Sequence, residues 1–421
     1  MFKGKKLLAT TLTLSMLMTT ALGCGVTEKQ ENSTADTQQG TEKVQTEAEG
    51  EKAENSESAD SSDWAAENKL NETESSEELY QKALETAGGE IHVYTVSGRM
   101  ENVKETFEED YPGLTLVVHD MNVNELLEKF SREYEAGIYT ADVIHVKEQT
   151  GQILKEYVET GMMHNYQPED IFGDVDEEYL QLTPMYFEAD WWYYNSDQYD
   201  ECPIDSWWDL TREEWNGKFM IVDPLTDVGY MAFLTTIVEN ADMMAESYKE
   251  EFGEDIVLAD DEPNAGYAFL KRFAQNNPIF ETSSNNIVKA VGAEGQTDAP
   301  LGYAVSSKIR ERDQQGYKLG IDPENFSPAC GIYGMNVVEI ADHAPNPDGA
   351  KLLVRYLTGD TDGTARGFEP YNTLGGWSVR SNVPKVEGNI DFEDYNAFPQ
   401  DFDYTYEHLN EVQEYWISVQ P

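Results

Sequence analysis

Short apolar runs alternate with amphipathic helical patterns from about residue 76 onward. Residues 75–78 read Ser-Ser-Glu-Glu, a capping box that predicts a helix start, and Gly88-Gly89 predicts its end. The runs at 90–96, 114–119 and 141–146 are typical of strands, and apolar residues at helical spacing follow each run. This alternation predicts a mainly parallel sheet with helices on both faces.

A second block of the same kind follows an aromatic segment at 184–195. We predict strands over 217–222, 300–306, 316–321 and 331–340, and helices from 226 onward, over 263–275 and over 347–358. The last strand is long enough to return to the first block. The predicted fold class is therefore α/β, with two lobes of mainly parallel sheet flanked by helices and a hinge between them. In such sheets ligands bind at the carboxyl ends of the strands.

The first 24 residues predict a secretory signal. Lys3, Lys5 and Lys6 precede an apolar, Thr-rich run at 7–22 that is shorter than an ordinary membrane span. The run ends in Ala-Leu-Gly-Cys24, which resembles the lipobox of bacterial lipoproteins. We therefore expect a signal peptide over 1–24, lipidation of Cys24, and attachment to the outer face of the cytoplasmic membrane. Cleavage without lipidation is the alternative.

Residues 25–75 are rich in Glu, Thr, Ser, Gln and Ala and have almost no large apolar side chains. Such a segment buries too little surface to offset its ordering entropy, so we expect a disordered acidic tether before a body over 76–421.

Composition narrows the classes of function. The chain of 421 residues holds 81 acidic residues against 29 Lys and Arg, a formal charge of −52, which excludes a nucleic-acid clamp. Three cysteines cannot build a disulfide framework, and we expect Cys202 and Cys330 to be unpaired. The sequence contains no Gly-x-Ser-x-Gly elbow, His-Glu-x-x-His or phosphate-loop motif, so an enzyme is the less favoured reading.

Several segments resemble successive blocks of the extracellular solute-binding proteins of ABC importers: 79–96, 107–118, 141–146, 206–224 and 343–359. They follow the order of that family across nearly the whole body, and they are most similar to its ferric-ion, phosphonate and polyamine-binding branch. The resemblance implies a type II periplasmic-binding-protein fold, with lobe 1 at about 88–187 and 335–421 and lobe 2 at about 196–330. It also implies a small-molecule ligand between the lobes, hinge closure, an ABC permease as partner, a monomer, and no cofactor.

The candidate ligand-binding residues stand where strands end and helices begin. Ser97, Gly98 and Arg99 lie at the start of the first sheet helix, where free N–H groups and the helix dipole favour an anion. Thr226 precedes a helix of the second lobe, at the place where the resemblance implies an anion-binding loop. Simple helix capping is the alternative at both places.

Tyr303, Ser306 and Ser307 end a predicted strand of the second lobe. Ferric-binding relatives place a Tyr-Tyr pair at this point, and here the matching pair is Ser306-Ser307. Hydroxyl groups beside Lys308 or Arg310 fit a small oxyanion better than iron, such as a phosphonate, a phosphate ester or a carboxylate. We predict no metal site. An exposed turn with solvated charges is the alternative.

Other ligands and roles stay open. The aromatic stretch at 186–194 is expected to be mostly core, although one or two rings could floor the cleft for a sugar or polyamine, with Glu188 or Asp190 as counter-charge. His145 is expected to have a structural role. A ferric-iron binder, a ligand-sensing partner of a membrane sensor kinase, and a surface-anchored hydrolase remain alternatives to the import protein.

Overall fold

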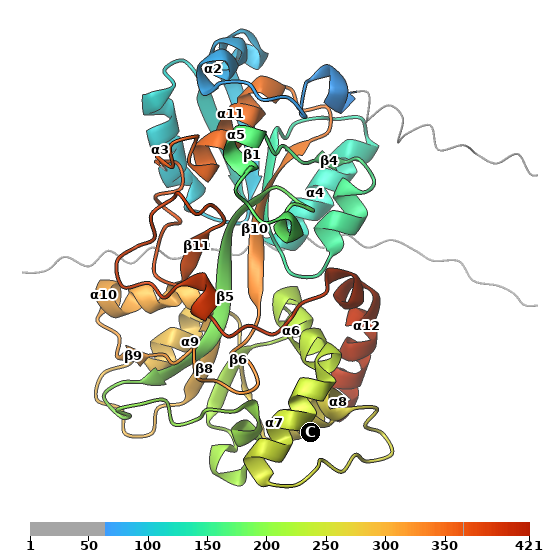
Figure 1. The fold of residues 1–421 in the computed structure, drawn as a ribbon, viewed down its shortest axis with the longest axis vertical. Coiled ribbons are helices and arrows are strands. Elements are labelled where there is room, and N and C mark those ends of the chain that lie inside the picture. The colour runs from blue at the N-terminus through green and yellow to red at the C-terminus, as the bar shows by residue number, and fades with distance from the viewer. Residues whose placement is uncertain (1–63, 365) are drawn as a thin grey trace, which may run out of the picture. The chain divides into compact units, whose positions relative to one another are not determined.

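The computed structural model describes residues 64–364 and 366–421, all within one compact unit, Asn55–Pro421 (Figure 1). The predicted signal peptide, the lipidated Cys24 and most of the predicted tether lie outside these residues. Among the described residues, no helix is both long and apolar enough to cross a membrane.

The first part of the body follows the predicted alternation. Its elements are α2 (Ser76–Glu85), β1 (Glu90–Thr95), α3 (Met100–Asp110), β2 (Thr115–Asp120), α4 (Val123–Glu135), β3 (Val143–Glu148), β4 (Met163–His164) and α5 (Glu169–Phe172). The predicted capping box is present, because the Ser75 side chain accepts from the Glu78 N–H and the Glu78 side chain accepts from the Ser75 N–H. β1 lies between β2 and β3 and is parallel to both, as the pattern predicts. A π-helix covers Ile153–Val158.

The second part holds the longest strand and a set of helices. Its elements are β5 (Pro184–Asn195), β6 (Phe219–Val222), α6 (Val228–Glu239), α7 (Ala241–Phe252), α8 (Ala265–Gln275), β7 (Ile279–Glu281), α9 (Ser284–Val291), β8 (Leu301–Val305), α10 (Glu311–Gln315) and β9 (Leu319–Gly320). The chain then forms β10 (Tyr333–Ala341), α11 (Pro347–Thr358), β11 (Gly376–Ser378) and α12 (Phe402–Val419).

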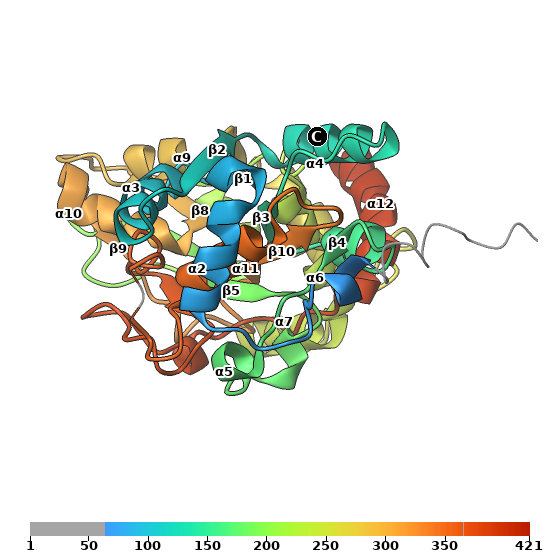
Figure 2. The ribbon, with the colours of Figure 1, turned by 90° about the horizontal axis from the view of Figure 1, so that it is seen from above.

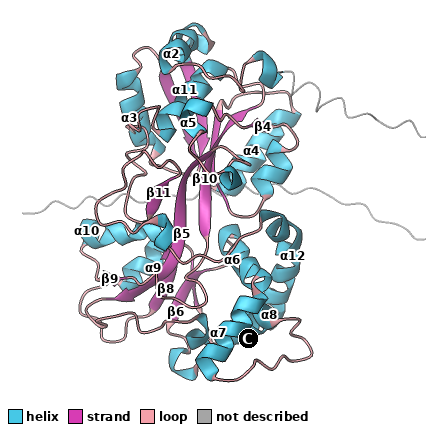
Figure 3. Ribbon diagram, in the orientation of Figure 1, coloured by secondary structure: helices cyan, strands magenta, loops and turns pink. Residues whose placement is uncertain are grey.

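Two antiparallel strands join the halves of the sheet. The strand order is β2-β1-β3-β10-β5-β8-β6-β7, in which β10 pairs with β3 and β5 (Figure 3). The long β5 pairs with β10 and β11 and, further along, with β8 and β9. We call β2-β1-β3-β10 with its helices the first lobe, and β8-β6-β7 with α6–α9 the second lobe. β10 confirms the long returning strand that the sequence predicts.

Apolar faces of the flanking helices hold each half of the sheet in place. In the first lobe, Leu79 of α2 and Phe107 of α3 join Leu353 of α11 in one buried cluster, and α2 lies against α11 (Figure 2). In the second lobe, Trp207 and Phe269 lie in a larger cluster that includes the aromatic run of β5. Burial of such side chains contributes about 1.5–3 kcal/mol each.

Residues at both ends of the body differ from the predicted division. Residues 64–75 were predicted as tether, but Leu70 is buried, the Trp64 ring stacks on His164 at 5.4 Å, and Glu74 pairs with Lys351. The predicted first lobe runs to residue 421, whereas α12 packs against α6 and α8 of the second lobe. Trp416 explains this placement, because it is fully buried in the cluster of the second lobe. Cys202 and Cys330 are free cysteines among the described residues.

Candidate functional site

The loop between β1 and α3 places Arg99 against the second lobe. Its Nη2 atom donates to Ser307 Oγ at 3.3 Å and lies 3.7 Å from Glu188 Oε1 on β5. The guanidinium also lies over the Tyr371 ring, 5.7 Å from the centroid. Only 21% of the Arg99 side chain is exposed, so these contacts hold a charge that is largely withdrawn from water.

The same loop has two backbone N–H groups, at the start of α3, that could donate to an anion. The Ser97 N–H donates to Thr95 Oγ1 at 3.1 Å, and the Ser97 carbonyl accepts from the Met100 N–H. Within the described residues, no acceptor takes the N–H of Gly98 or Arg99. The start of α3 therefore keeps donors available, as expected for a helix without a side-chain cap. The Asp120 carboxylate lies beside Gly98.

Ser307 receives two guanidinium donors. It lies in the turn Ser306–Arg310 that follows β8, and Arg310 Nη1 donates to its Oγ at 2.8 Å and to its carbonyl at 2.5 Å. Arg99 reaches the same Oγ from the first lobe. Ser307 is 1% exposed. One buried hydroxyl thus joins two arginines that approach from opposite lobes.

Ser306 has a different environment from its neighbour. Its Oγ accepts from the Ala189 N–H at 3.0 Å and donates to the Gly375 carbonyl. A Cβ on Gly375, whose φ is +76°, would lie 2.6 Å from the Ser306 carbonyl oxygen. The contacts of Ser306 are with backbone on both sides, so its hydroxyl fastens the 375–376 segment to β5.

The positive charges of Arg99, Lys308 and Arg310 lie close enough together to repel one another. Burial lowers the pKa of Lys308, and the charge of Arg310 lowers it further. Burial and then the charge of Arg99 lower the pKa of Arg310. Glu188 and Glu311 are the carboxylates that oppose these shifts. Arg99, Lys308 and Arg310 therefore form a half-buried cationic group, here called the cationic cluster.

His145 of β3 lies beneath the cationic cluster. It is 0% exposed, its Nδ1 lies 2.8 Å from Thr95 Oγ1, and its ring meets Tyr371 edge to face at 5.4 Å. Burial, followed by the charge of Arg99, lowers the pKa of His145 to about 3, so the ring is neutral. Its Nε2 has no hydrogen-bond partner within the described residues.

Glu188 and Asp190 bring carboxylates to the same face of β5, because alternate residues of a strand share a face. Asp190 is 5% exposed, and its Oδ2 lies 3.9 Å from Lys147 Nζ of β3. The Lys147 side chain crosses Gly334 of β10, where a Cβ would come within 1.9 Å of its Cε. The sequence analysis did not single out Lys147. A lysine directly after the predicted strand at 141–146 could have indicated it, because every other residue of β3 is buried.

Thr226 and Tyr303 are placed away from this cluster. Thr226 is exposed, and its hydroxyl donates to the Asp223 carbonyl at 3.1 Å. Asp227 accepts from the Gly229 and Tyr230 N–H groups, so a carboxylate already occupies the start of α6. Tyr303 is 1% exposed, and its ring packs among aromatic side chains of the second lobe: Trp192, Trp207, Tyr230 and Phe233.

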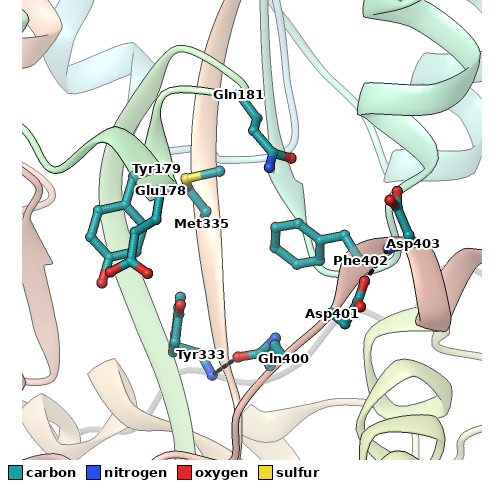
Figure 4. Close-up of a pocket in the computed structure, with 9 residues that line it drawn as sticks. All are labelled: Glu178, Tyr179, Gln181, Tyr333, Met335, Gln400, Asp401, Phe402 and Asp403. Carbon is teal, nitrogen blue, oxygen red and sulfur yellow. Dashed lines mark hydrogen bonds between the residues drawn. The ribbon is translucent and has the colours of Figure 1, made fainter.

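A separate pocket of about 360 Å³ lies on the opposite face of the crossing strands (Figure 4). Tyr333 and Met335 line it, and they pair with Ala189 and Phe187, so they face away from Glu188. Its remaining lining residues are Glu178, Tyr179, Gln181, Gln400, Asp401, Phe402 and Asp403. None of the residues predicted from the sequence lines this pocket.

A protein-family profile matches most of the chain. The profile of the family described as "Bacterial extracellular solute-binding protein" matches residues 102–400. No curated protein gives a significant match to the sequence.

Solved structures share the fold at low identity. The apo ferric ion-binding protein A of Pasteurella haemolytica has 16% identity and a TM-score of 0.58, covering 79% of this chain and 98% of its own. Iron-bound HitA of Pseudomonas aeruginosa has 13% identity and a TM-score of 0.58, covering 78% and 99%. AfuA of Actinobacillus pleuropneumoniae, a periplasmic binding protein with fructose-6-phosphate bound, has 16% identity and a TM-score of 0.57, covering 79% and 98%. These likenesses confirm the predicted type II periplasmic-binding-protein fold.

Proposed function

Because the chain belongs to the bacterial extracellular solute-binding protein family, we propose that it captures a small oxyanion between its lobes and delivers it to the permease of an ABC importer. The family is one of binding proteins, in agreement with the prediction that the chain is not an enzyme. One observation carries the choice of ligand: the buried Ser307 hydroxyl accepts from Arg99 of the first lobe and Arg310 of the second.

The proposed ligand contacts are Arg99, Ser307, Lys308 and Arg310, with the N–H groups of Gly98 and Arg99. Guanidinium groups present paired donors that match the oxygens of phosphate, phosphonate and carboxylate. A bound oxyanion would neutralise the cationic cluster and replace the single hydroxyl as the acceptor that both arginines share. Because those arginines come from different lobes, the anion would favour the closed arrangement.

A phosphonate or phosphate ester fits the cluster better than a monoanion, since the positive charges of Arg99, Lys308 and Arg310 repel one another and a second negative charge would offset this repulsion. Ser306, Thr226 and Tyr303 are given no ligand contact in this proposal, because their hydroxyl groups or rings are engaged elsewhere or buried. Ferric iron is included among the ligands to be tested, because two of the similar structures are described as ferric ion-binding or iron-bound proteins.

We also propose that the mature protein is a monomer held at the outer face of the cytoplasmic membrane by a lipidated Cys24. The support is the basic start, the short apolar run and the Ala-Leu-Gly-Cys24 ending. Mass spectrometry of the mature N-terminus would detect the acyl groups. Cys24→Ser should release the protein into the soluble fraction, and retention of that variant in membranes would contradict the anchor.

Thermal unfolding against a ligand panel tests the proposed function. The panel contains phosphonates, phosphate esters, carboxylates, polyamines, sugars and Fe(III). A binder at one hundred times its Kd should stabilise the protein by about 2.7 kcal/mol. We expect the phosphonates or phosphate esters to give the largest shifts, and stabilisation by Fe(III), polyamines or sugars alone would overturn the proposal. Mass spectrometry of the bound solute after incubation checks for turnover.

A further inference from the structure

A buried carboxylate on the face of β5 that also bears Glu188 has an oxygen without a hydrogen-bond donor. The Oδ1 atom of Asp190 has no partner within the described residues, and the Asp190 side chain is 7% exposed. The nearest cation, Lys147 Nζ, lies 3.9 Å from the other oxygen, beyond hydrogen-bond distance. Because buried polar groups are normally paired, this oxygen is an open acceptor at the site.

Asp190 stands at an acidic end of the site. The charges of Asp227, which caps α6, and of Glu188 act on it, while Lys147 partly compensates. The cationic cluster lies toward the other end, where Arg99 contacts Glu188. Glu188, which Arg99 contacts, and Asp190 are two residues apart along β5, a span of about 6.6–6.8 Å.

We propose that the solute is zwitterionic, with a protonated amine that donates to Asp190 Oδ1 while its oxyanion occupies the cationic cluster. This inference rests on the proposed function, because it takes the oxyanion site as given. An ammonium group carries three donors, and it would supply the missing partner of Asp190 together with a charge opposite to the excess acid there. An uncharged terminus would leave the carboxylate unpaired, at a cost in affinity.

Pairs of ligands that differ only at one terminus measure the contribution of the amine separately from that of the phosphonate. Alkylphosphonates with two, three and four carbons are each measured with a terminal amine and with a terminal methyl group, by isothermal titration calorimetry. We expect the amine to improve affinity by about tenfold or more at the best chain length. Asp190→Asn should bring the amine and methyl ligands to within about twofold of each other, because only the amine ligand loses a partner. Thermal unfolding of this variant verifies that it is folded.

The wild-type protein offers a second readout that does not depend on a variant. Burial raises the pKa of Asp190 to about 6. The ratio of amine to methyl affinity should therefore fall between about pH 7.5 and pH 5, as Asp190 takes up a proton. The ammonium group lowers the second pKa of the phosphonate relative to the methyl series, so each affinity is corrected for the titration of its own ligand before the ratio is taken. The titratable groups that face Asp190 are Lys147, Glu188, Tyr193, Asp227, Tyr230, Tyr303, Cys330 and Tyr395. The tyrosines and Cys330 stay uncharged in this pH range, because burial raises the pKa of each.

The outcomes are distinct. If methyl-terminated phosphonates bind as tightly as their amines at every chain length, the zwitterion inference falls and the oxyanion proposal stands. An amine preference that survives unchanged in Asp190→Asn also overturns the inference. If neither series binds and no phosphate ester or carboxylate stabilises the protein in the thermal panel, the proposed function fails as well.

Discussion

Arg99 Nη2 lies 3.3 Å from Ser307 Oγ, although 208 residues separate the two along the chain. Arg99 begins a helix of the first lobe and Ser307 lies in the turn after a strand of the second, so the contact spans the lobes. It requires the lobes to be close together, and a ligand that strengthened it would hold them there. The cationic cluster is therefore a place where binding and closure can be coupled.

Arg99→Gln tests whether the first lobe contributes to ligand affinity. The substitution removes a charge and its paired donors while it keeps a polar side chain of moderate length. We expect the affinity for the best phosphonate or phosphate ester to fall by about 10–100-fold, as for a lost charge-assisted hydrogen bond. Arg132→Gln is the control, because Arg132 is 67% exposed on α4 and should leave affinity unchanged. Equal affinities in all three proteins would remove Arg99 from the site.

Ser306→Ala and Ser307→Ala form a matched pair with opposite expectations. Ser306→Ala leaves the Ala189 N–H and the Gly375 carbonyl without their buried partner, so it should lower the free energy of unfolding by about 1–3 kcal/mol. Ser307→Ala should change ligand affinity more than stability, because both arginines keep other contacts. Chemical denaturation and calorimetry on both variants check this division. A larger loss of affinity in Ser306→Ala would reverse the assignment.

Glu339 should make stability depend on pH. It is fully buried and accepts from Thr183 N–H at 2.6 Å and Thr183 Oγ1 at 2.9 Å, and burial raises its pKa to about 8. In the unfolded chain it deprotonates near its ordinary pKa of about 4.3. Its stabilising contribution is thus complete below about pH 4, is lost as pH rises from there through about 8, and changes no further at higher pH.

Denaturation with urea from about pH 5 to pH 9 measures this effect. Asp142, whose pKa burial raises to about 7, should add to the same decline in the free energy of unfolding. Glu339→Gln cannot ionise, so its curve should be flatter by a few kcal/mol across this range. Parallel curves for the wild type and Glu339→Gln would contradict the predicted role.

Glu74 should stabilise the body, although it lies before the first predicted helix. It pairs with Lys351, which is 1% exposed and also lies 2.9 Å from Asp348. Glu74→Gln should lower the free energy of unfolding by about 1–3 kcal/mol, since Lys351 retains one carboxylate. Glu72→Gln is the matched control, because its ion pair with Lys69 is exposed and should contribute less than about 1 kcal/mol. Equal stability of the two variants would place residue 74 outside the folded body.

The sequence predicted helices, strands and caps, which depend on neighbouring residues, better than it predicted contacts between residues that are far apart in the chain. The Ser75 capping box and the strand β10 follow from neighbouring residues, and both are present. The sequence could not predict that the Ser306 hydroxyl bonds backbone groups while the Ser307 hydroxyl accepts from arginines. The two residues are adjacent in a short turn, and their side chains point to different partners. Thr226 and Tyr303 show the same limit: the partner of each side chain is set by packing, which the sequence pattern does not encode. The contact between Trp64 and His164 is another such case.

The position of β10 has a consequence for how the chain is made. It stands between β3 and β5, although residues 333–341 leave the ribosome long after both of those strands. Until then the two halves of the sheet have no strand to connect them, and their edges stay open. Unpaired strand edges favour aggregation, so we expect a chain that ends before β10 to aggregate more readily than the whole chain.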